Sequence, residues 1–320
     1  GLYFLYRMRV LALVPGDIGN QILFFPTLET LKQQYPQASI DVLVEPQSKK
    51  AYRVCKNVDD VLVFDFQDRN SFADYLNLLG TVRDREYDVL ISLKTTWRIK
   101  LLLWLNGIPT RIGYQDDSPL YLSAAVTRKP EQYTAQMYHD LVTGLGIQAP
   151  CPTLTINVPT EDIRWAESEQ QRRSMDSGYI VLWDQPSATE ISSYPITSWQ
   201  KIVQDMEQRQ TGLSIVILQS DRNQDWVTTM VSANGNLKAI APPDVGKTAA
   251  IIAGANLILC TSGMAMQLAV ATDTYTFALA SNQDSKTIPT TKENCILISS
   301  KTSDLKDIQP ETVIAQLWQQ

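Results

Sequence analysis

Apolar stretches of strand length alternate with segments of helical periodicity along almost the whole chain. The strand-like stretches at residues 9–14, 39–45 and 178–183 contain the uninterrupted apolar runs VLALV, VLV and YIVLW. Such strands are buried on both faces, which is typical of parallel sheets covered by helices on each side. The sequence therefore predicts an α/β fold of doubly wound parallel sheets.

The chain is long enough for two domains, since 320 residues correspond to two units of roughly 150 residues each. The predicted series of strands and helices is interrupted at residues 147–160, a segment that contains three prolines. Domain boundaries often fall in segments of this kind. We therefore expect a first domain at residues 8–155 and a second at residues 156–320. Residues 1–7, which precede Met8, are left out of this prediction.

The composition argues against several kinds of partner and site. The chain carries 28 Lys and Arg against 34 Asp and Glu, whereas a surface that binds nucleic acid is usually basic. No apolar stretch reaches the roughly 18 residues that a membrane-spanning helix needs. The single histidine, His139, argues against a metal site built of imidazoles and is expected to be structural. The four cysteines form no C-x-x-C pair and are expected to be reduced thiols, which indicates a cytoplasmic protein without metal or cofactor.

A glycine-containing loop, GDIGN at residues 16–20, joins the first predicted strand to a helix. The backbone N–H groups at such a helix start can bind an anion or a sugar hydroxyl, here at Gly16, Gly19 and Asn20. The alternative is a tight turn in which Asn20 caps the helix. Asp17 is either a catalytic base or an exposed turn aspartate.

A second candidate site lies at Thr261, Ser262 and Gly263, where a predicted strand ends and a helix begins. Ligands of parallel sheets bind at this end of the strands, so these residues could hold a diphosphate. The alternative is ordinary helix capping by Ser262. Trp183 also follows a strand, and it either stacks on a base or sugar ring or fills the space of a lost ligand. Lys247 opens a predicted helix, where a positive charge is unfavourable, which indicates either a nearby anion or a side chain that faces solvent.

Three charged residues lie in and just after the predicted strand TRIGY. Arg111, Asp116 and Asp117 are expected at the edge between the domains. Either aspartate could act as a base towards a hydroxyl group. The alternative is a solvated loop.

Long segments of the chain resemble glycosyltransferase family nine, the ADP-heptose lipopolysaccharide heptosyltransferases and their relatives. The resemblance lies in MRVLALVPGDIGNQILFFPTLETLKQQYPQASIDVLVEP, in YDVLISLKTTWRIKLLLWLNGIPTRIGY, in AAIIAGANLILCTSG with LAVATDTYTFAL, and in the loop NQDSKTIP. It extends in the same order from Met8 over nearly the whole chain. The resemblance implies the GT-B architecture of two Rossmann-like domains facing a cleft, with the acceptor bound by residues 8–155 and the donor by residues 156–320. It also implies that the last helix, at residues 310–318, packs back on the first domain.

The resemblance further implies an activity. An inverting transferase of this kind moves a sugar from a nucleotide sugar, foremost an ADP-sugar, to a saccharide or lipid-linked glycan acceptor in bacterial lipopolysaccharide biosynthesis. It would work in the cytoplasm or at the inner face of the membrane. Its implied donor side comprises Trp183, Ser192, Lys247, Thr261, Ser262, Gly263 and Gln267, and its acceptor side comprises Gly19, Arg111 and Asp116.

Four positions depart from the family pattern. Asn20 stands where the family has the aspartate proposed as catalytic base, and an amide cannot take a proton from the acceptor hydroxyl. Ser192 stands in place of a lysine that helps to neutralise the donor phosphates. Thr261 replaces the aspartate of an Asp-Thr-Gly turn, and Gln267 replaces the histidine that follows it.

These substitutions leave two hypotheses. In the first, the chain is an active transferase in which Asp17, Asp116 or Asp117 supplies the base and helix N-termini stabilise the leaving diphosphate. In the second, the chain is a catalytically degenerate relative that serves as a binding, scaffold or regulatory partner. Exposed Trp, Tyr and Phe side chains would then form an apolar patch at a protein-partner surface.

Overall fold

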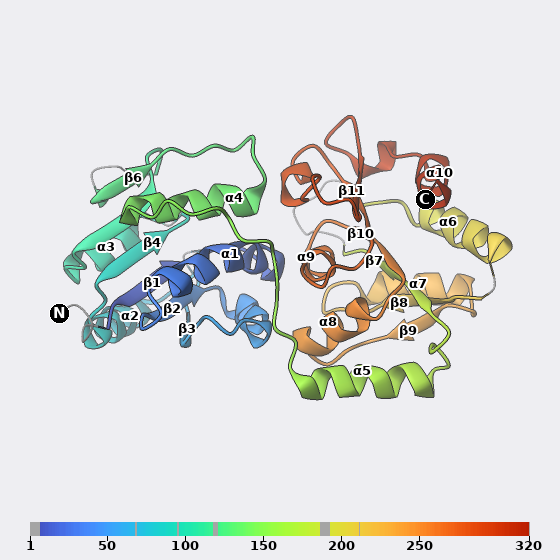
Figure 1. The fold of residues 1–320 in the computed structure, drawn as a ribbon, viewed down its shortest axis with the longest axis horizontal. Coiled ribbons are helices and arrows are strands. Elements are labelled where there is room, and N and C mark those ends of the chain that lie inside the picture. Colours follow the sequence, from blue (N-terminus) through green and yellow to red (C-terminus); the bar gives the residue numbers. More distant parts are fainter. Residues whose placement is uncertain are drawn as a thin grey trace. The chain divides into compact units, whose positions relative to one another are not determined.

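The computed structural model describes residues 7–67, 69–94, 96–117, 121–185, 193–210 and 212–319. The chain divides into two compact units, unit 1 (Gly1–Asn157) and unit 2 (Val158–Gln320), which run from blue to green and from green to red in Figure 1. In the described part of the chain each unit contains one six-stranded sheet. All neighbouring strands in both sheets are parallel, which confirms the prediction of doubly wound parallel sheets.

The elements of the two units follow one another as strand and helix. Unit 1 consists of β1 (Arg9–Leu13), α1 (Ile18–Gln34), β2 (Ser39–Val44), a 3-10 helix (Pro46–Val54), β3 (Asp60–Val63), α2 (Phe72–Arg85), β4 (Val89–Ser92), α3 (Trp97–Leu105), β5 (Thr110–Tyr114), β6 (Ala124–Val126), α4 (Thr134–His139) and a 3-10 helix (Asp140–Leu145). Unit 2 consists of α5 (Thr160–Arg172), β7 (Tyr179–Trp183), α6 (Ile196–Arg209), β8 (Ser214–Leu218), α7 (Gln224–Ala233), β9 (Lys238–Ile240), α8 (Val245–Ala253), β10 (Leu257–Thr261), α9 (Met264–Ala271), β11 (Thr276–Ala280), a 3-10 helix (Ser285–Thr287), β12 (Cys295–Ser299), a 3-10 helix (Leu305–Asp307) and α10 (Pro310–Trp318).

In each sheet the direction of winding reverses next to the first strand. The order in unit 1 is β3-β2-β1-β4-β5-β6, so the reversal lies between β1 and β4. The order in unit 2 is β12-β11-β10-β7-β8-β9, so the reversal lies between β7 and β10. Doubly wound sheets bind ligands outside the carboxyl ends of their strands at such reversals. The loops after β1, β7 and β10 therefore hold the candidate site residues.

The helices of unit 1 form layers on both faces of its sheet. On one face, α2 contributes Leu78 and Val82 and α3 contributes Ile99, Leu102 and Leu103 to one buried core with the strands. The α1 helix joins β1 to β2, in the opposite direction along the sheet, and a right-handed crossover therefore places it on the other face. There it packs against α4 and the two 3-10 helices. This layering leaves the outer sides of α2 and α3 at the surface of unit 1.

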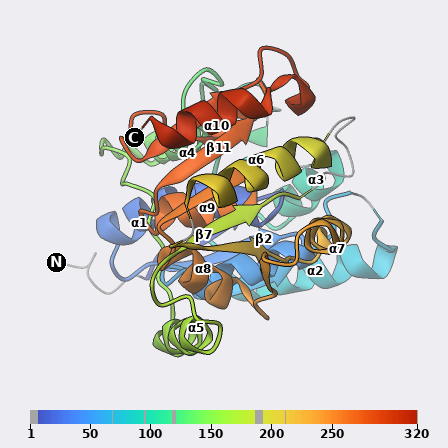
Figure 2. The same ribbon diagram turned by 90° about the vertical axis from the view of Figure 1, so that its right-hand side faces the viewer.

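The last helix, α10, packs on α6 of its own unit, and the two helices lie side by side in Figure 2. Val313 and Leu317 of α10 belong to the buried core of unit 2. The indole N–H of Trp318 donates to the carboxylate of Asp205 at 2.9 Å. The apolar face of α10 contributes to the core of unit 2. That the last helix also packs back on the first domain stays a prediction.

The single histidine joins α1 to α4. The hydroxyl of Thr30 and Nε2 of His139 lie 2.7 Å apart, and both side chains are buried. Burial disfavours the imidazolium and lowers the pKa of His139 from its ordinary value of 6.5. His139 therefore has a structural environment, in agreement with the structural role expected for it.

This environment makes the stability of the protein pH-dependent. Because the folded-state pKa of His139 is depressed, its contribution to stability is complete above pH 6.5 and is lost as the pH falls through the folded pKa. Below that ordinary value we expect the free energy of unfolding to fall by up to about 1.4 kcal/mol per pH unit. Urea denaturation at about pH 7.5 and about pH 5.5 measures the effect. The His139→Gln variant should lose this component of the slope, and an unchanged slope would contradict the assignment.

Candidate functional site

The loop after β1 begins α1 through a side-chain cap from Asp17. Its carboxylate accepts a hydrogen bond from the backbone N–H of Asn20 at 2.9 Å, and its backbone is extended, as in an N-cap. Asn20 and the buried Gly19 therefore lie inside the first turn of α1. The prediction that Asn20 caps this helix is wrong, because Asp17 is the residue at which the extended chain ends.

The Asn20 side chain is held on both sides of its amide. Its carbonyl oxygen accepts from the hydroxyl of Tyr138 on α4 at 2.5 Å, and its amide nitrogen donates to the carbonyl of Pro15 at 2.5 Å. Burial raises the pKa of Tyr138 to about 12, so its phenol stays protonated and donates. Gly16 has φ +106°, and a Cβ there would lie 2.7 Å from the amide nitrogen of Asn20. Asn20 thus ties the loop to α4, a contact that the sequence did not reveal.

The other charged side chains considered for unit 1 also have partners. The carboxylate of Asp116 pairs with Arg128 at 2.9 Å, and that of Asp117 pairs with Lys100 at 2.6 Å. The guanidinium of Arg111 donates to two backbone carbonyls, those of Tyr121 and Ile108, at 2.7 Å each. Arg111 therefore braces the chain around β5.

At the carboxyl end of β7, the side chain of Trp183 is buried against the turn that follows β10. Its indole N–H donates to the hydroxyl of Ser220 at 3.3 Å. Gly263 has φ +144°, and a Cβ at this position would lie 2.8 Å from a ring carbon of Trp183. The indole therefore fills the space beside Gly263 at the start of α9.

Asp184 follows Trp183 and places a carboxylate at the carboxyl end of β7. It is only 2% exposed and accepts from the indole N–H of Trp199 at 2.8 Å and from the hydroxyl of Thr261 at 2.8 Å. Burial raises the pKa of Asp184 above its ordinary value, and the two donors oppose this effect. Sequence reasoning assigned no role to this carboxylate. An acid directly after a buried strand at a winding reversal was the available signal.

The turn after β10 leads into α9, and the side chains of Ser262 and Gln267 lie at this junction. The hydroxyl of Ser262 lies 3.4 Å from that of Thr287, and Gly263 is the N-cap of α9 without a side-chain hydrogen bond. The alternative that Ser262 caps this helix is therefore wrong. The amide nitrogen of Gln267 donates to the carbonyl of Thr287 at 2.9 Å. Its buried carbonyl oxygen has no hydrogen-bond partner among the described residues.

Lys247 has carboxylate partners within its own unit. Its ammonium lies 2.8 Å from the fully buried carboxylate of Asp162 on α5 and 2.8 Å from that of Asp244, the N-cap of α8. Hydrogen bonds with these two groups raise the pKa of Lys247. The negative charge beside Lys247 in the first turn of α8 is thus supplied by two aspartates, Asp162 and Asp244. Ser192, the remaining donor-side residue, lies outside the described residues.

Comparison with known proteins identifies the family. The model of glycosyltransferase family 9 (heptosyltransferase) matches residues 75–317. The chain belongs to glycosyltransferase family 9. A crystal structure of a family 9 glycosyltransferase from Veillonella parvula superposes with a TM-score of 0.78 at 18% identity, over 96% of this chain and 95% of that chain. The E. coli heptosyltransferase WaaC with ADP-2-deoxy-2-fluoro heptose gives a TM-score of 0.75 at 14% identity, over 97% and 99% of the two chains. The fold is GT-B.

One relative of this family 9 member has a name of a different kind. The photosynthetic NDH subunit of subcomplex B 1, chloroplastic, from Arabidopsis thaliana is 23% identical over 95% of this chain and 72% of its own length. Its name describes a subunit of an assembly, whereas the names of the solved structures describe transferases.

No group of three or more His, Cys, Asp or Glu in the described ranges could hold a metal ion. None of the helices in the part of the chain that the structure describes has the length and apolar character that a membrane crossing requires.

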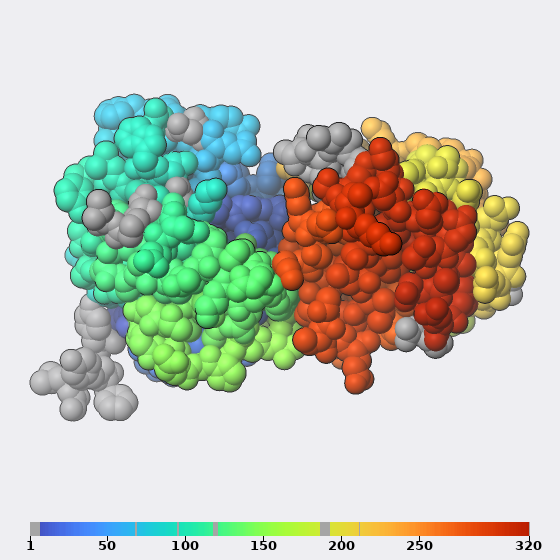
Figure 3. All heavy atoms as spheres, turned by 90° about the horizontal axis from the view of Figure 1, so that it is seen from above, coloured from blue at the N-terminus to red at the C-terminus, as the bar shows by residue number. Residues whose placement is uncertain are grey.

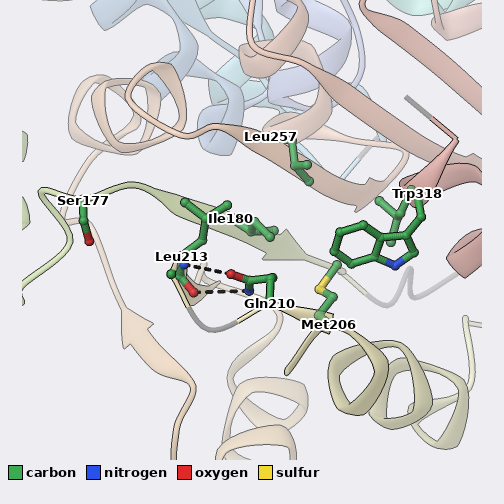
Figure 4. A pocket seen from close by; sticks show the side chains of 9 residues that line it. Ser177, Ile180, Met206, Gln210, Leu213, Leu257 and Trp318 are labelled. Carbon is green, nitrogen blue, oxygen red and sulfur yellow. Dashed lines mark hydrogen bonds between the residues drawn. The ribbon is translucent and has the colours of Figure 1, made fainter. Parts of the chain in front are cut away.

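A hollow of about 400 Å³ lies at the opposite edge of the unit 2 sheet, near the starts of β7 and β10 (Figure 4). It is lined largely by apolar side chains, among them Ile180, Met206 and Trp318. The side-chain amide of Gln210 is bonded to the backbone N–H and carbonyl of Leu213. The hollow, which is lined by residues near the starts of β7 and β10, is separate from the carboxyl ends of these strands.

Proposed function

We propose that this chain is a catalytically degenerate family 9 protein that serves as a binding or scaffold component of an assembly. The observation that carries the proposal is the indole of Trp183, which is seated against Gly263 at the start of α9. A diphosphate bound by the backbone N–H groups of this turn would need the space that the ring occupies. Trp183 thus acts as a structural filler, and stacking on a base or sugar would require it to move.

The state of the acids in unit 1 supports the same proposal. A general base must lie within hydrogen-bond reach of the hydroxyl that it deprotonates and must be free to accept the proton. Asp17 caps α1, and Asp116 and Asp117 are paired with cations. Asn20 is an amide with both ends bonded within unit 1. The described residues therefore offer no uncommitted carboxylate at the loop where the family resemblance implies a base.

The plant relative favours a role in an assembly. It extends over 95% of this chain and is named as a subunit of a photosynthetic NDH complex. We infer from this name that a family 9 fold can serve as a component of a larger complex, and we propose such a role for this chain. Its four cysteines are free thiols, which supports a cytoplasmic location.

Thermal unfolding with a nucleotide panel tests the proposal. ADP, UDP, GDP and their sugar conjugates are added to the purified protein, and we expect no shift of the melting temperature. A ligand at ~100 times its Kd would stabilise the fold by about 2.7 kcal/mol, which such a measurement detects. WaaC is the positive control, since it has been solved with ADP. A clear shift with any of these nucleotides would overturn the proposal and identify the donor class.

A second candidate function is sugar transfer from an ADP-sugar to a saccharide or lipid-linked glycan acceptor, as in lipopolysaccharide biosynthesis. The unpartnered carbonyl oxygen of Gln267 favours it, because a buried acceptor without a donor indicates a missing group. The Asn20→Asp variant separates this candidate from the first. Transfer that appears only in the variant would show a working donor site that lacks its base.

A further inference from the structure

Large apolar side chains are exposed on one side of unit 1, over α2, α3 and the end of β3. We call this surface the α2–α3 patch. It consists of Val63, Phe72, Leu76, Trp97, Leu101, Trp104 and Leu105. The two helices pack on the same face of the sheet and contact each other. Figure 3 shows the chain from α2 to α3, in cyan and teal, at the surface of unit 1.

Both helices present apolar side chains on their outer sides. On α2, Phe72 and Leu76 lie four residues apart and are exposed. On α3 the exposed apolar side chains are Trp97, Leu101, Trp104 and Leu105. A helix that borders water normally carries polar residues on its outer side, and one that is apolar all round is normally covered. Since the inner side of α3 is already in the core of unit 1, its outer side has the composition of a contact surface.

The exposed area of the patch matches one side of a stable protein–protein interface. The exposed fractions are 78% for Phe72, 68% for Trp97 and 57% for Trp104. These three aromatic side chains alone expose on the order of 400 Å². A standard interface takes about 800 Å² from each partner, and roughly 60% of this area is apolar. The aromatic side chains therefore supply most of the apolar part, and the aliphatic members of the patch add to it.

The charges around the patch are divided between its two helices. Four nearby acids have a cation partner within unit 1, and these are Asp60, Asp65, Asp116 and Asp117. The exposed charges on α2 and directly after it are three acids and one base, a net charge of −2, namely Asp74, Arg83, Asp84 and Glu86. The exposed charges just before and on α3 are two bases, Lys94 and Arg98, and residues 89–115 contain no Asp or Glu. The patch thus has an acidic half on α2 and a basic half on α3.

This division of charge makes the patch complementary to itself. Both helices begin after the carboxyl ends of parallel strands and pack on one face of the sheet, so they run in the same direction. A two-fold axis parallel to the helices, between two facing patches, places α2 of each copy over α3 of the other. The acidic half of each patch then meets the basic half of its partner at two equivalent contacts. A partner surface of a single charge would match only one half of the patch.

We propose that the α2–α3 patch forms a two-fold symmetric dimer with a second copy of this chain. The apolar side chains of both copies leave water between the helices, and the unlike halves fix which helix lies on which. Tryptophan is enriched among the residues that dominate the binding energy of interfaces, which gives Trp97 and Trp104 the largest share. This dimer does not depend on whether the protein transfers a sugar or joins a larger assembly.

Analytical ultracentrifugation of the full chain over a range of protein concentrations tests the proposal. We expect a monomer–dimer equilibrium without larger species, because a two-fold contact closes on itself. The double variant Trp97→Ser/Trp104→Ser should weaken dimerisation by about a hundredfold or more, since each substitution occurs twice in the dimer. Trp318→Ser changes an exposed indole in unit 2 and should dimerise like the parent. A parent that stays monomeric, or a dimer that the double variant retains, would overturn the proposal without touching the nucleotide result.

Charge reversal tests the pairing of α2 with α3 across the dimer. The variant Asp74→Lys/Asp84→Lys makes both halves basic, and Lys94→Glu/Arg98→Glu makes both halves acidic, while the apolar side chains stay in place. Each variant alone should dimerise about tenfold more weakly than the parent, because like charges meet at both contacts. A mixture of the two should form a heterodimer more tightly than either variant pairs with itself, because unlike halves then meet twice. Circular dichroism checks that both variants keep the parental fold.

The mixture distinguishes a second copy from any other occupant of the patch. A mixture that associates no better than its separate components would overturn the proposal. So would a parent that stays monomeric and binds lipid vesicles or another protein through the patch, because the occupant would then not be a second copy.

Discussion

Replacement of Gly263 by alanine is expected to lower the free energy of unfolding by about 2–6 kcal/mol. Its φ of +144° with ψ of −156° lies in a region that residues with a Cβ rarely adopt, which costs of order 1–3 kcal/mol. The new Cβ would also lie 2.8 Å from one ring carbon of Trp183 and 3.1 Å from another. Overpacking of this kind typically costs about 1–3 kcal/mol more. Urea denaturation measures the sum.

Two further variants separate the backbone strain at Gly263 from the contact with the Trp183 ring. Gly80→Ala adds the same methyl group inside α2, where no heavy atom would lie within 4 Å of it, and should stabilise the protein by up to about 1 kcal/mol. The double variant Gly263→Ala/Trp183→Leu removes the ring but not the backbone strain, so it should show a favourable coupling between the two sites. Additive effects would mean that the indole does not press on the turn. The proposed filling of the ligand space by Trp183 would then lose its support.

The architecture followed from the sequence because parallel sheets leave a strong local pattern. A strand buried on both faces is apolar at most of its positions, and the chain repeats such strands with helices between them. The exception is β6, which has only three residues, Ala124–Val126, and too few positions to show any pattern. Because Trp183 and Thr261 end predicted strands, the sequence also placed them at the carboxyl ends of the parallel strands, where ligands of such sheets bind.

The contacts within the site could not be predicted in the same way. Asp17 and Asn20 are both good caps, and only the point at which the extended chain ends decides between them. The dipole argument left open an anion near Lys247 or a side chain that faces solvent, and the partner Asp162 lies 85 residues away along the chain. Tyr138 lies 118 residues from its partner Asn20, and Thr261 lies 77 residues from its partner Asp184. Local pattern carries no information about such pairs.

The second large effect is expected at Asp184. Alanine at this position removes the acceptor for the indole N–H of Trp199 and for the hydroxyl of Thr261, both buried. Each orphaned donor costs about 1–3 kcal/mol, so we expect Asp184→Ala to lower the free energy of unfolding by about 2–4 kcal/mol. The matched control is Asp205→Ala, which removes the acceptor of an exposed indole, Trp318, and should cost at most about 1 kcal/mol.

A double-mutant cycle and a pH series locate the cause of this loss. Thr261→Val removes one of the two donors, so it should cost less in the Asp184→Ala background than in the parent. Burial raises the folded-state pKa of Asp184, so its stabilising contribution is complete below the ordinary value of about 3.9 and is lost as the pH rises through the folded pKa. The free energy of unfolding of the Asp184→Ala variant should lack this dependence on pH. A variant that keeps the parental pH slope and shows no coupling to Thr261 would mean that Asp184 does not hold the turn after β10. The Thr261 hydroxyl would then be available to a ligand, and the proposal of a degenerate site would lose this support.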